Sequence, residues 1–262
     1  MTIVKLEFKS NLKTLLIWSI TVGLMIFSFM LMFPMMEESL TQMGDLYSNM
    51  AGFSAAFGLD KLSIYTAMGF YGTEVGAVLS LGGALFAALL GAGMLSKEEG
   101  EHTAEFLLAS PISRVNIVFQ KLLALIIIIF SFELICISMA TLSFVLINES
   151  ITMPEFLLYH LAQFSMHVEI ACICFCISAF AKKANAGLGL GIATILYFAD
   201  IMVKTIPELK PLKYITPFYY SGAADIFSSG KIDGILILIG ILATILSVLL
   251  AFIKYSKKDI TA

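Results

Sequence analysis

Charged residues are scarce in this 262-residue chain. Asp, Glu, Lys and Arg make up 13% of the sequence, hydrophobic residues make up 59%, and the mean hydropathy is +0.95. Soluble proteins carry about 25% charged residues, and one soluble core of this size cannot bury so much apolar surface. The composition therefore excludes a soluble globular protein and predicts an integral membrane protein.

An excess of positive charge is also missing. The formal net charge is −3, the isoelectric point is about 5.6, and Arg114 is the single arginine. Nucleic-acid-binding proteins usually present a strongly basic surface, so we expect no nucleic-acid partner. The cysteines lie in apolar stretches, and Cys172-x-Cys174-x-Cys176 on a helix alternates faces, unlike a metal-binding pair. We expect them to be buried apolar side chains.

Motifs for nucleotide binding or hydrolysis are absent from the sequence. The nearest approach to a P-loop, Gly230-Lys231, lacks the upstream glycine and the following hydroxyl residue that such a loop needs. Gly187 and Gly191 belong to a glycine-rich apolar stretch with no strand before it, so we expect a close helix contact there. H-E-x-x-H and G-x-S-x-G do not occur. We expect no catalytic site, resident metal or cofactor.

Long apolar segments are what the sequence does contain. A helix needs about 20 apolar residues to cross the hydrocarbon layer. Six segments meet this requirement, and they predict an all-α protein that is a single transmembrane domain over residues 1–262. The predicted spans are 15–36, 75–96, 122–147, 156–181, 184–203 and 234–253.

The distribution of basic residues predicts the orientation of these spans. If the N-terminus is cytoplasmic, eleven of the sixteen basic residues lie inside and five lie outside, which satisfies the positive-inside rule. Both termini are then cytoplasmic in a multi-pass protein of the cell membrane. We expect residues 1–14 to form a short interfacial helix. Prolines and aromatics in the outer segment 204–233 predict short interfacial helices before the last span.

The inner segment 97–121 is the most polar part of the chain. Thr103 can cap a helix whose first turn contains Glu105, Pro111 ends that helix, and Ser113 can cap the next one. The first helix is acidic at its start and apolar at Phe106, Leu107 and Leu108. An apolar ridge rimmed by charge on an inner loop indicates a surface that docks a protein, and an ordinary interfacial helix is the alternative.

The same segment resembles the signature of ABC-2-type permease subunits, which typically reads E-x-x-x-G-T-x-E-x-L-L-x-x-P-[IV]-S-R followed by a lysine and a hydrophobic span. His102 departs from the pattern, because the family usually has glycine there. The matching residues are Glu98 or Glu99, Thr103, Glu105, Leu107, Leu108, Pro111, Ile112, Ser113, Arg114 and Lys121.

The resemblance implies a type V exporter-like permease fold, in which this segment is a coupling helix seated in a separate ABC ATP-binding subunit. Two such subunits and a second permease chain, identical or homologous, would complete the transporter, and ATP would be bound by the partner. The implied cargo is a hydrophobic or amphipathic compound such as a drug, antimicrobial peptide or lipid. The implied roles are docking for Phe106, Leu107 and Leu108, charge pairing for Glu98, Glu101 and Glu105, and fixing the loop for Arg114. Pro111 and Ser113 complete the implied partner-binding residues.

Polar residues inside the predicted spans need a separate explanation, because each is costly in hydrocarbon. These residues are Glu133, His160, His167, Glu169 and Asp200. They line a translocation path, or they form interhelical hydrogen bonds or a seam between subunits.

Two other functions remain open on the sequence. An ion-driven secondary transporter would use the intramembrane carboxylates Glu133, Glu169 and Asp200 as relays. A membrane metal protein would use His160, His167 and the methionine-rich first outer segment, from Glu37 to about Thr73. Within the ABC-2 family, a permease that serves copper-enzyme maturation is a further possibility.

Overall fold

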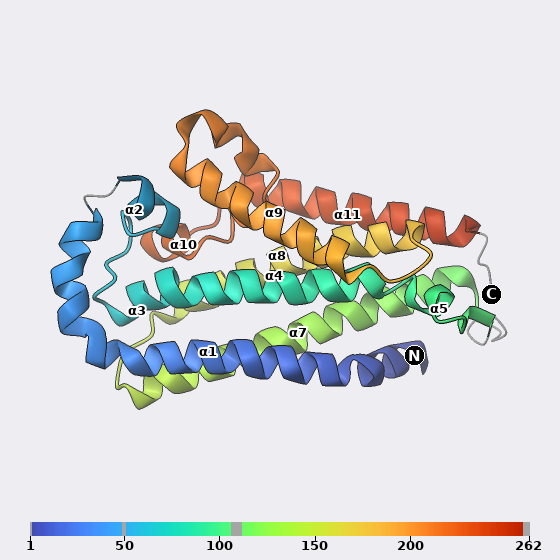
Figure 1. Cartoon of the computed structure of the whole chain (residues 1–262), viewed down its shortest axis with the longest axis horizontal. Helices are drawn as coiled ribbons and strands as arrows, with labels where there is room; N and C mark the ends of the chain where they lie inside the picture. The colour runs from blue at the N-terminus through green and yellow to red at the C-terminus, as the bar shows by residue number, and fades with distance from the viewer. Residues whose placement is uncertain (1, 49–50, 106–111, 259–262) are drawn as a thin grey trace.

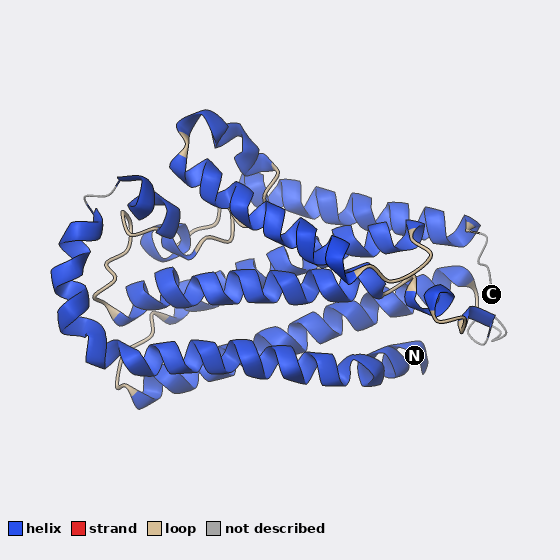
Figure 2. Ribbon diagram, viewed as in Figure 1, coloured by secondary structure: helices blue, strands red, loops and turns tan. Residues whose placement is uncertain are grey.

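The computed structural model describes residues 2–48, 51–105 and 112–258, and within them it contains helices and no strand (Figures 1 and 2). Six stretches are long and apolar enough to cross a membrane, which confirms the predicted number. They are α1 (Thr2–Ser48), the continuous run of α3 (Ala67–Phe70), η1 (Tyr71–Val75) and α4 (Gly76–Gly93), α7 (Arg114–Leu146), α8 (Met153–Phe180), α9 (Ala186–Thr205) and α11 (Gly234–Lys257).

Short helices occupy the two ends of the bundle. Both termini and α5 (Lys97–Gly100) lie at one end, which we call the termini end (Figure 1). At the opposite end lie α2 (Ala51–Phe57), η2 (Pro207–Tyr214) and α10 (Ala223–Ser229). The segment before the last span therefore contains the short helices that its prolines predict.

The first helix differs from expectation. The sequence predicts a short interfacial helix over residues 1–14, but this stretch is not a short helix, since α1 runs without a break from Thr2 to Ser48. No proline or glycine interrupts these first turns, so the helix that crosses the apolar layer simply begins early. Pro34 lies inside α1, and α1 bends in its second half (Figure 1), as expected where proline removes a backbone hydrogen bond.

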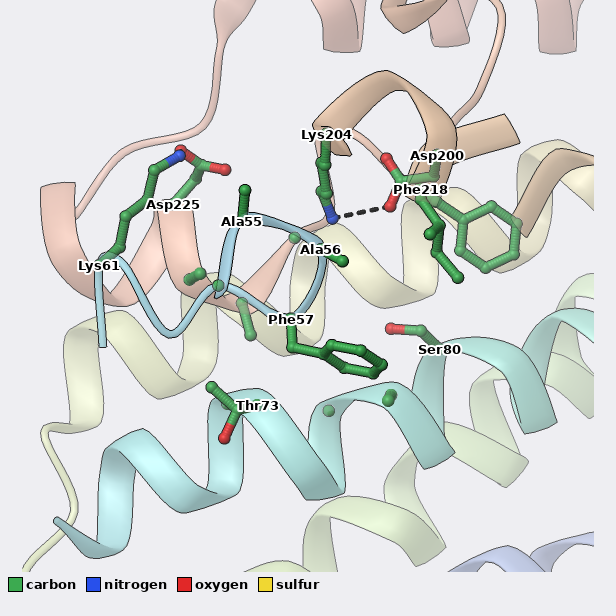
Figure 3. Close-up of a pocket in the computed structure, with 18 of the residues that line it drawn as sticks. Ala55, Ala56, Phe57, Lys61, Thr73, Ser80, Asp200, Lys204, Phe218 and Asp225 are labelled. Atoms are coloured by element: carbon green, nitrogen blue, oxygen red, sulfur yellow. Dashed lines mark hydrogen bonds and ion pairs between the residues drawn. The ribbon is translucent and has the colours of Figure 1, made fainter. Parts of the chain in front are cut away.

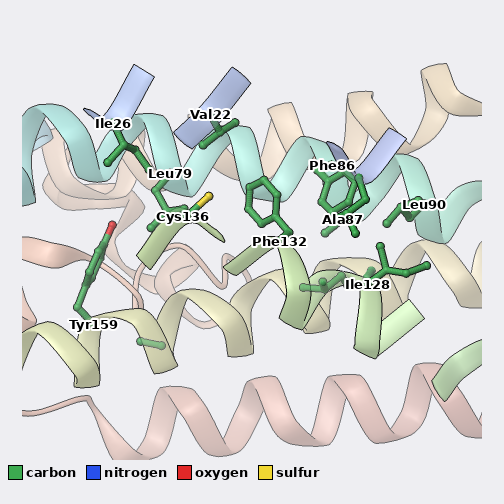
Figure 4. Packing of buried hydrophobic residues seen from close by; sticks show 14 of the residues in the cluster. Val22, Ile26, Leu79, Phe86, Ala87, Leu90, Ile128, Phe132, Cys136 and Tyr159 are labelled. Atoms are coloured by element: carbon green, nitrogen blue, oxygen red, sulfur yellow. The ribbon is translucent and has the colours of Figure 1, made fainter. Parts of the chain in front are cut away.

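The core lies between α1, α4, α7 and α8. Val22 of α1, Phe86 of α4 and Phe132 of α7 meet there, and the Phe86 and Phe132 ring centroids are 4.9 Å apart (Figure 4). Lipid is as apolar as these side chains, so van der Waals packing rather than removal from water stabilises the contact. The arrangement of the core therefore depends on how closely the shapes of these side chains fit together.

Glycines allow α4 to approach its neighbours closely. A Cβ on Gly91 would lie 2.4 Å from the carbonyl oxygen of Ala171 in α8. On α9, a Cβ on Gly189 would lie 2.7 Å from the carbonyl oxygen of Ala88. The prediction for Gly187 and Gly191 is wrong, since a Cβ on Gly191 would meet nothing within 4 Å and one on Gly187 only Asn185 of the same turn. Gly189 is the residue of this stretch that faces α4.

Candidate functional site

Helix ends that are distant in sequence meet at the termini end through buried charges. The side chain of Lys121, in the second turn of α7, is fully buried. Its Nζ donates to the carbonyl oxygen of Met94, 2.7 Å away, and lies 2.9 Å from a carboxylate oxygen of Glu7 in α1. It also pairs with Glu98 of α5. A buried ammonium is tolerated only when it is compensated in this way.

Lys97 extends this arrangement by pairing with the other carboxylate oxygen of Glu7. We call Glu7, Lys97, Glu98 and Lys121 the Lys121 network. The network connects α1, α5 and α7, and it contains two carboxylates and two ammonium groups. It fixes the start of the 97–121 segment against the first turns of α1.

A second set of contacts ties the end of α11 to the same segment. Lys258, the first residue after α11, places its Nζ 2.7 Å from a carboxylate oxygen of Glu99 and donates to the carbonyl oxygen of Ala181. Arg114, at the start of α7, donates to the carbonyl oxygen of Lys258. Together with the Lys121 network, these contacts join α1, α5, α7, α8 and α11.

The described residues that follow α5 in the 97–121 segment are mostly exposed. Glu101, His102, Thr103 and Glu105 are exposed, whereas Ala104 is buried. His102 has φ of 55°, a left-handed conformation that glycine adopts most easily and histidine more often than most other residues. This explains the departure from the ABC-2 pattern, because the position needs positive φ and histidine supplies it.

The structure places the other predicted residues of this segment unequally. Phe106, Leu107, Leu108 and Pro111 lie outside the described residues. Ser113 caps α7 by accepting from the Asn116 amide, which confirms that part of the prediction.

Three of the predicted intramembrane residues form one buried cluster with Tyr71. A carboxylate oxygen of Glu133 lies 2.7 Å from Nδ1 of His160, and the other lies 3.4 Å from Nδ1 of His167. The Tyr71 hydroxyl lies 2.8 Å from Nε2 of His160. Both ring nitrogens of His160 therefore have partners, and the cluster links η1, α7 and α8 through interhelical hydrogen bonds.

Sequence reasoning missed Tyr71. This tyrosine lies in the first turn of η1, a π-helical segment, and is fully buried. The spacing of residues in the sequence shows which side chains share a face only if the helix is a regular α-helix. It therefore gave no signal that Tyr71, in a π-helical segment, faces His160. The only signal in the sequence was that Tyr71 lies just before the predicted span 75–96, where tyrosine is common.

Glu169 and Asp200 lie apart from this cluster and have their own partners. Glu169 accepts a 2.9 Å hydrogen bond from the Tyr220 hydroxyl, and Asp200 forms a 2.7 Å ion pair with Lys204. Across residues 2–48, 51–105 and 112–258, no group of three or more His, Cys, Asp or Glu side chains is arranged to hold a metal ion. The metal-protein alternative therefore gains no support.

Comparison with known proteins gives the chain a family. A search of curated proteins found no match. A family model described as ABC-2 family transporter protein matches residues 1–260, which is nearly the whole length. The six apolar helices agree with a multi-pass membrane protein of this kind. The chain therefore belongs to the ABC-2 family of transporter proteins.

Proposed function

We propose that this chain is the permease subunit of an ATP-driven exporter and that residues 97–121 couple it to a separate ATP-binding subunit. The observation that carries the proposal is the termini end, where buried ion pairs hold both flanks of this segment while Glu101 and Glu105 remain exposed. A docking element must present exposed side chains and be firmly attached to the spans.

The attachment suggests how motion reaches the spans. A displacement of α5 acts on α1 and α7 through the Lys121 network, and on α11 through the contact of Glu99 with Lys258. Buried pairs with good geometry resist separation, because parting them leaves an uncompensated charge. Closure of the ATP-binding subunits would thus be transmitted to helices rather than absorbed by a loop.

The chain's lack of a P-loop fits this division of work. ATP would be bound and hydrolysed by the partner, two copies of which would act with two permease chains, identical or homologous. The chain itself would be a transport subunit without its own cofactor, in the cell membrane with both termini cytoplasmic. A hydrophobic or amphipathic cargo suits the apolar spans. The ion-driven alternative gains no support from the family match.

The proposal is tested first by a mild-detergent pull-down of the tagged chain, followed by ATPase assays. We expect a P-loop ATPase to copurify, with activity that cargo stimulates. Reversing the charges of Glu101 and Glu105 to lysine should lower this stimulation at least about fivefold, since misplaced charge at an interface costs several kcal/mol. The matched control is reversal of Glu149, between α7 and α8, and of Glu208 in η2, both of which are exposed and lie outside the 97–121 segment. A chain that purifies alone and is indifferent to ATP would contradict the proposal.

A further inference from the structure

A small cavity lies at the end of the bundle opposite the termini (Figure 3). Its volume is about 90 Å³, and its wall comes from α2 and the turn after it, the start of α4, one side of α9, and residues 218–225. Pockets for drug-sized ligands measure about 300–1,000 Å³, whereas one water needs about 10–15 Å³. The cavity therefore suits a small polar group.

Two ion pairs from three different segments line this cavity. Lys61 lies 2.7 Å from Asp225, and Lys204 lies 2.7 Å from Asp200 (Figure 3). Burial lowers the pKa of Lys61, but the hydrogen bond and charge of Asp225 outweigh this effect and hold the pKa above its usual value. Asp60 adds a third carboxylate to the wall. Both signs of charge are thus available within one small space.

Asp200 has an unused hydrogen-bonding capacity. Asp200 is only 4% exposed, and its Oδ2 accepts a hydrogen bond from Lys204. Oδ1 is buried and has no hydrogen bond from any described residue. A buried carboxylate oxygen without a donor is costly, so this atom favours a ligand that brings an N–H or O–H group.

Gly222 leaves room where the opposite charges converge. A Cβ at this position would lie 3.6 Å from Nζ of Lys204 and 3.8 Å from Oδ2 of Asp225. Those are ordinary contact distances, so a ligand atom beside Gly222 can touch a cation and an anion of the wall. Phe57, Tyr197 and Tyr219 also line the cavity and add aromatic side chains to its wall.

We propose that this cavity binds a small zwitterionic group that carries a primary ammonium and an oxyanion. The ammonium donates to Asp200 and Asp225, and the oxyanion accepts from Lys204. A simple anion would face three carboxylates, and a simple cation would leave Lys204 without a new partner. Such a group is found on an ethanolamine phospholipid and on soluble phosphoethanolamine, which share this chemistry. The site is separate from ATP coupling, so its binding is measured without ATP.

The test is calorimetric titration of the purified full chain in detergent with three probes. These are phosphoethanolamine, a short-chain phosphatidylethanolamine, and a short-chain phosphatidylglycerol, which lacks the ammonium. We expect the ethanolamine lipid to bind more tightly than the glycerol lipid. Binding of soluble phosphoethanolamine as well would show that the head group suffices, and binding of the lipid alone would identify a lipid site. Absence of binding by both ethanolamine probes would overturn the proposal.

Two variants and one control locate the binding. Asp200→Asn removes a charge-assisted hydrogen bond and should weaken binding about tenfold or more. Gly222→Ala keeps every charge and meets no close contact, yet its methyl group occupies the point between Lys204 and Asp225 and should weaken binding similarly. Glu208→Gln, exposed on η2 and outside the cavity, should bind as the unchanged protein does. A Gly222→Ala protein with an unchanged melting temperature and unchanged affinity would refute the site, whether or not Asp200→Asn folds.

Discussion

Lys121 shows how a single side chain can organise one end of a membrane protein. It is fully buried, yet its ammonium group contacts Glu7 of α1, Glu98 of α5 and the carbonyl of Met94 at the end of α4. The sequence marks Lys121 only as the lysine that follows the ABC-2 pattern. Its partners could not be predicted, because Glu7 lies 114 positions away and no local spacing relates the two.

Replacing Lys121 with methionine should destabilise the protein strongly. Methionine keeps much of the side-chain volume, but Glu98 loses its ammonium partner and Glu7 keeps only Lys97. Removing one partner of a buried pair costs about 3–5 kcal/mol. We expect a clearly lower melting temperature in a detergent thermal-shift assay. Lys257→Met, an exposed change in the last turn of α11, is the control, and equal melting of the two variants would disprove the structural role of Lys121.

Residues with local partners were easier to predict from the sequence. Ser113 caps α7 because a hydroxyl three positions before a free amide can accept from it, and this relation is fixed by neighbouring residues alone. By contrast, sequence reasoning assigned Glu98 to contact with a partner protein, and the fold pairs it with Lys121. Of the three glutamates assigned to charge pairing with a partner, Glu101 and Glu105 are exposed and remain able to form such pairs.

At the scale of elements, apolar runs predicted six spans because each run is a continuous property of the sequence. The way these helices face one another was not predictable to the same degree. Gly187, Gly189 and Gly191 share a stretch of alternating leucine and glycine, and composition does not distinguish them. Only the packing of α9 on α4 shows that Gly189 faces the neighbour.

The two glycines of α9 should therefore respond differently to the same substitution. In Gly189→Ala the new methyl lies 2.7 Å from the Ala88 carbonyl oxygen and 2.9 Å from the Ala92 Cβ, so α9 must move away from α4. Overpacking of this kind costs about 1–3 kcal/mol. Gly191→Ala meets nothing within 4 Å and should be neutral or stabilising by up to about 1 kcal/mol, because alanine favours the helix.

Melting temperatures of the purified variants in one detergent measure this difference. The two substitutions add the same atoms to the same helix, so each is the control for the other. A Gly189→Ala protein as stable as Gly191→Ala would show that α9 does not approach α4 as closely as the structure indicates.

At the scale of the whole molecule, large apolar surfaces are left uncovered. In the most apolar stretches of α9 and α11, only 22% and 17% of the residues are buried within the chain. Large exposed side chains follow one another along α11, namely Ile235, Leu238, Ile241, Leu242, Ile245, Leu246, Leu249, Leu250 and Ile253. This surface fits lipid or a second permease chain, since soluble monomers rarely expose a patch of this size.

The position of both termini at one end makes the orientation directly testable. Epitope tags at the two ends should be inaccessible to antibody in intact cells, because basic residues favour the cytoplasm at that end. A tag inserted at the exposed turn 230–233, at the other end, should be accessible. Permeabilised cells provide the control, in which all three tags must react. Surface exposure of either terminal tag would contradict the proposed orientation.

The sequence by itself determined that this is a helical membrane protein with six spans and termini at one end, because hydrophobic length and local capping depend on neighbouring residues. Only the tertiary structure decided which polar groups meet. His160 pairs with Glu133 and with Tyr71 across three helical segments, and Lys121 pairs with Glu7 and Glu98. In an apolar interior each polar group must find a partner, and the partner is chosen by how whole helices pack rather than by spacing along the chain.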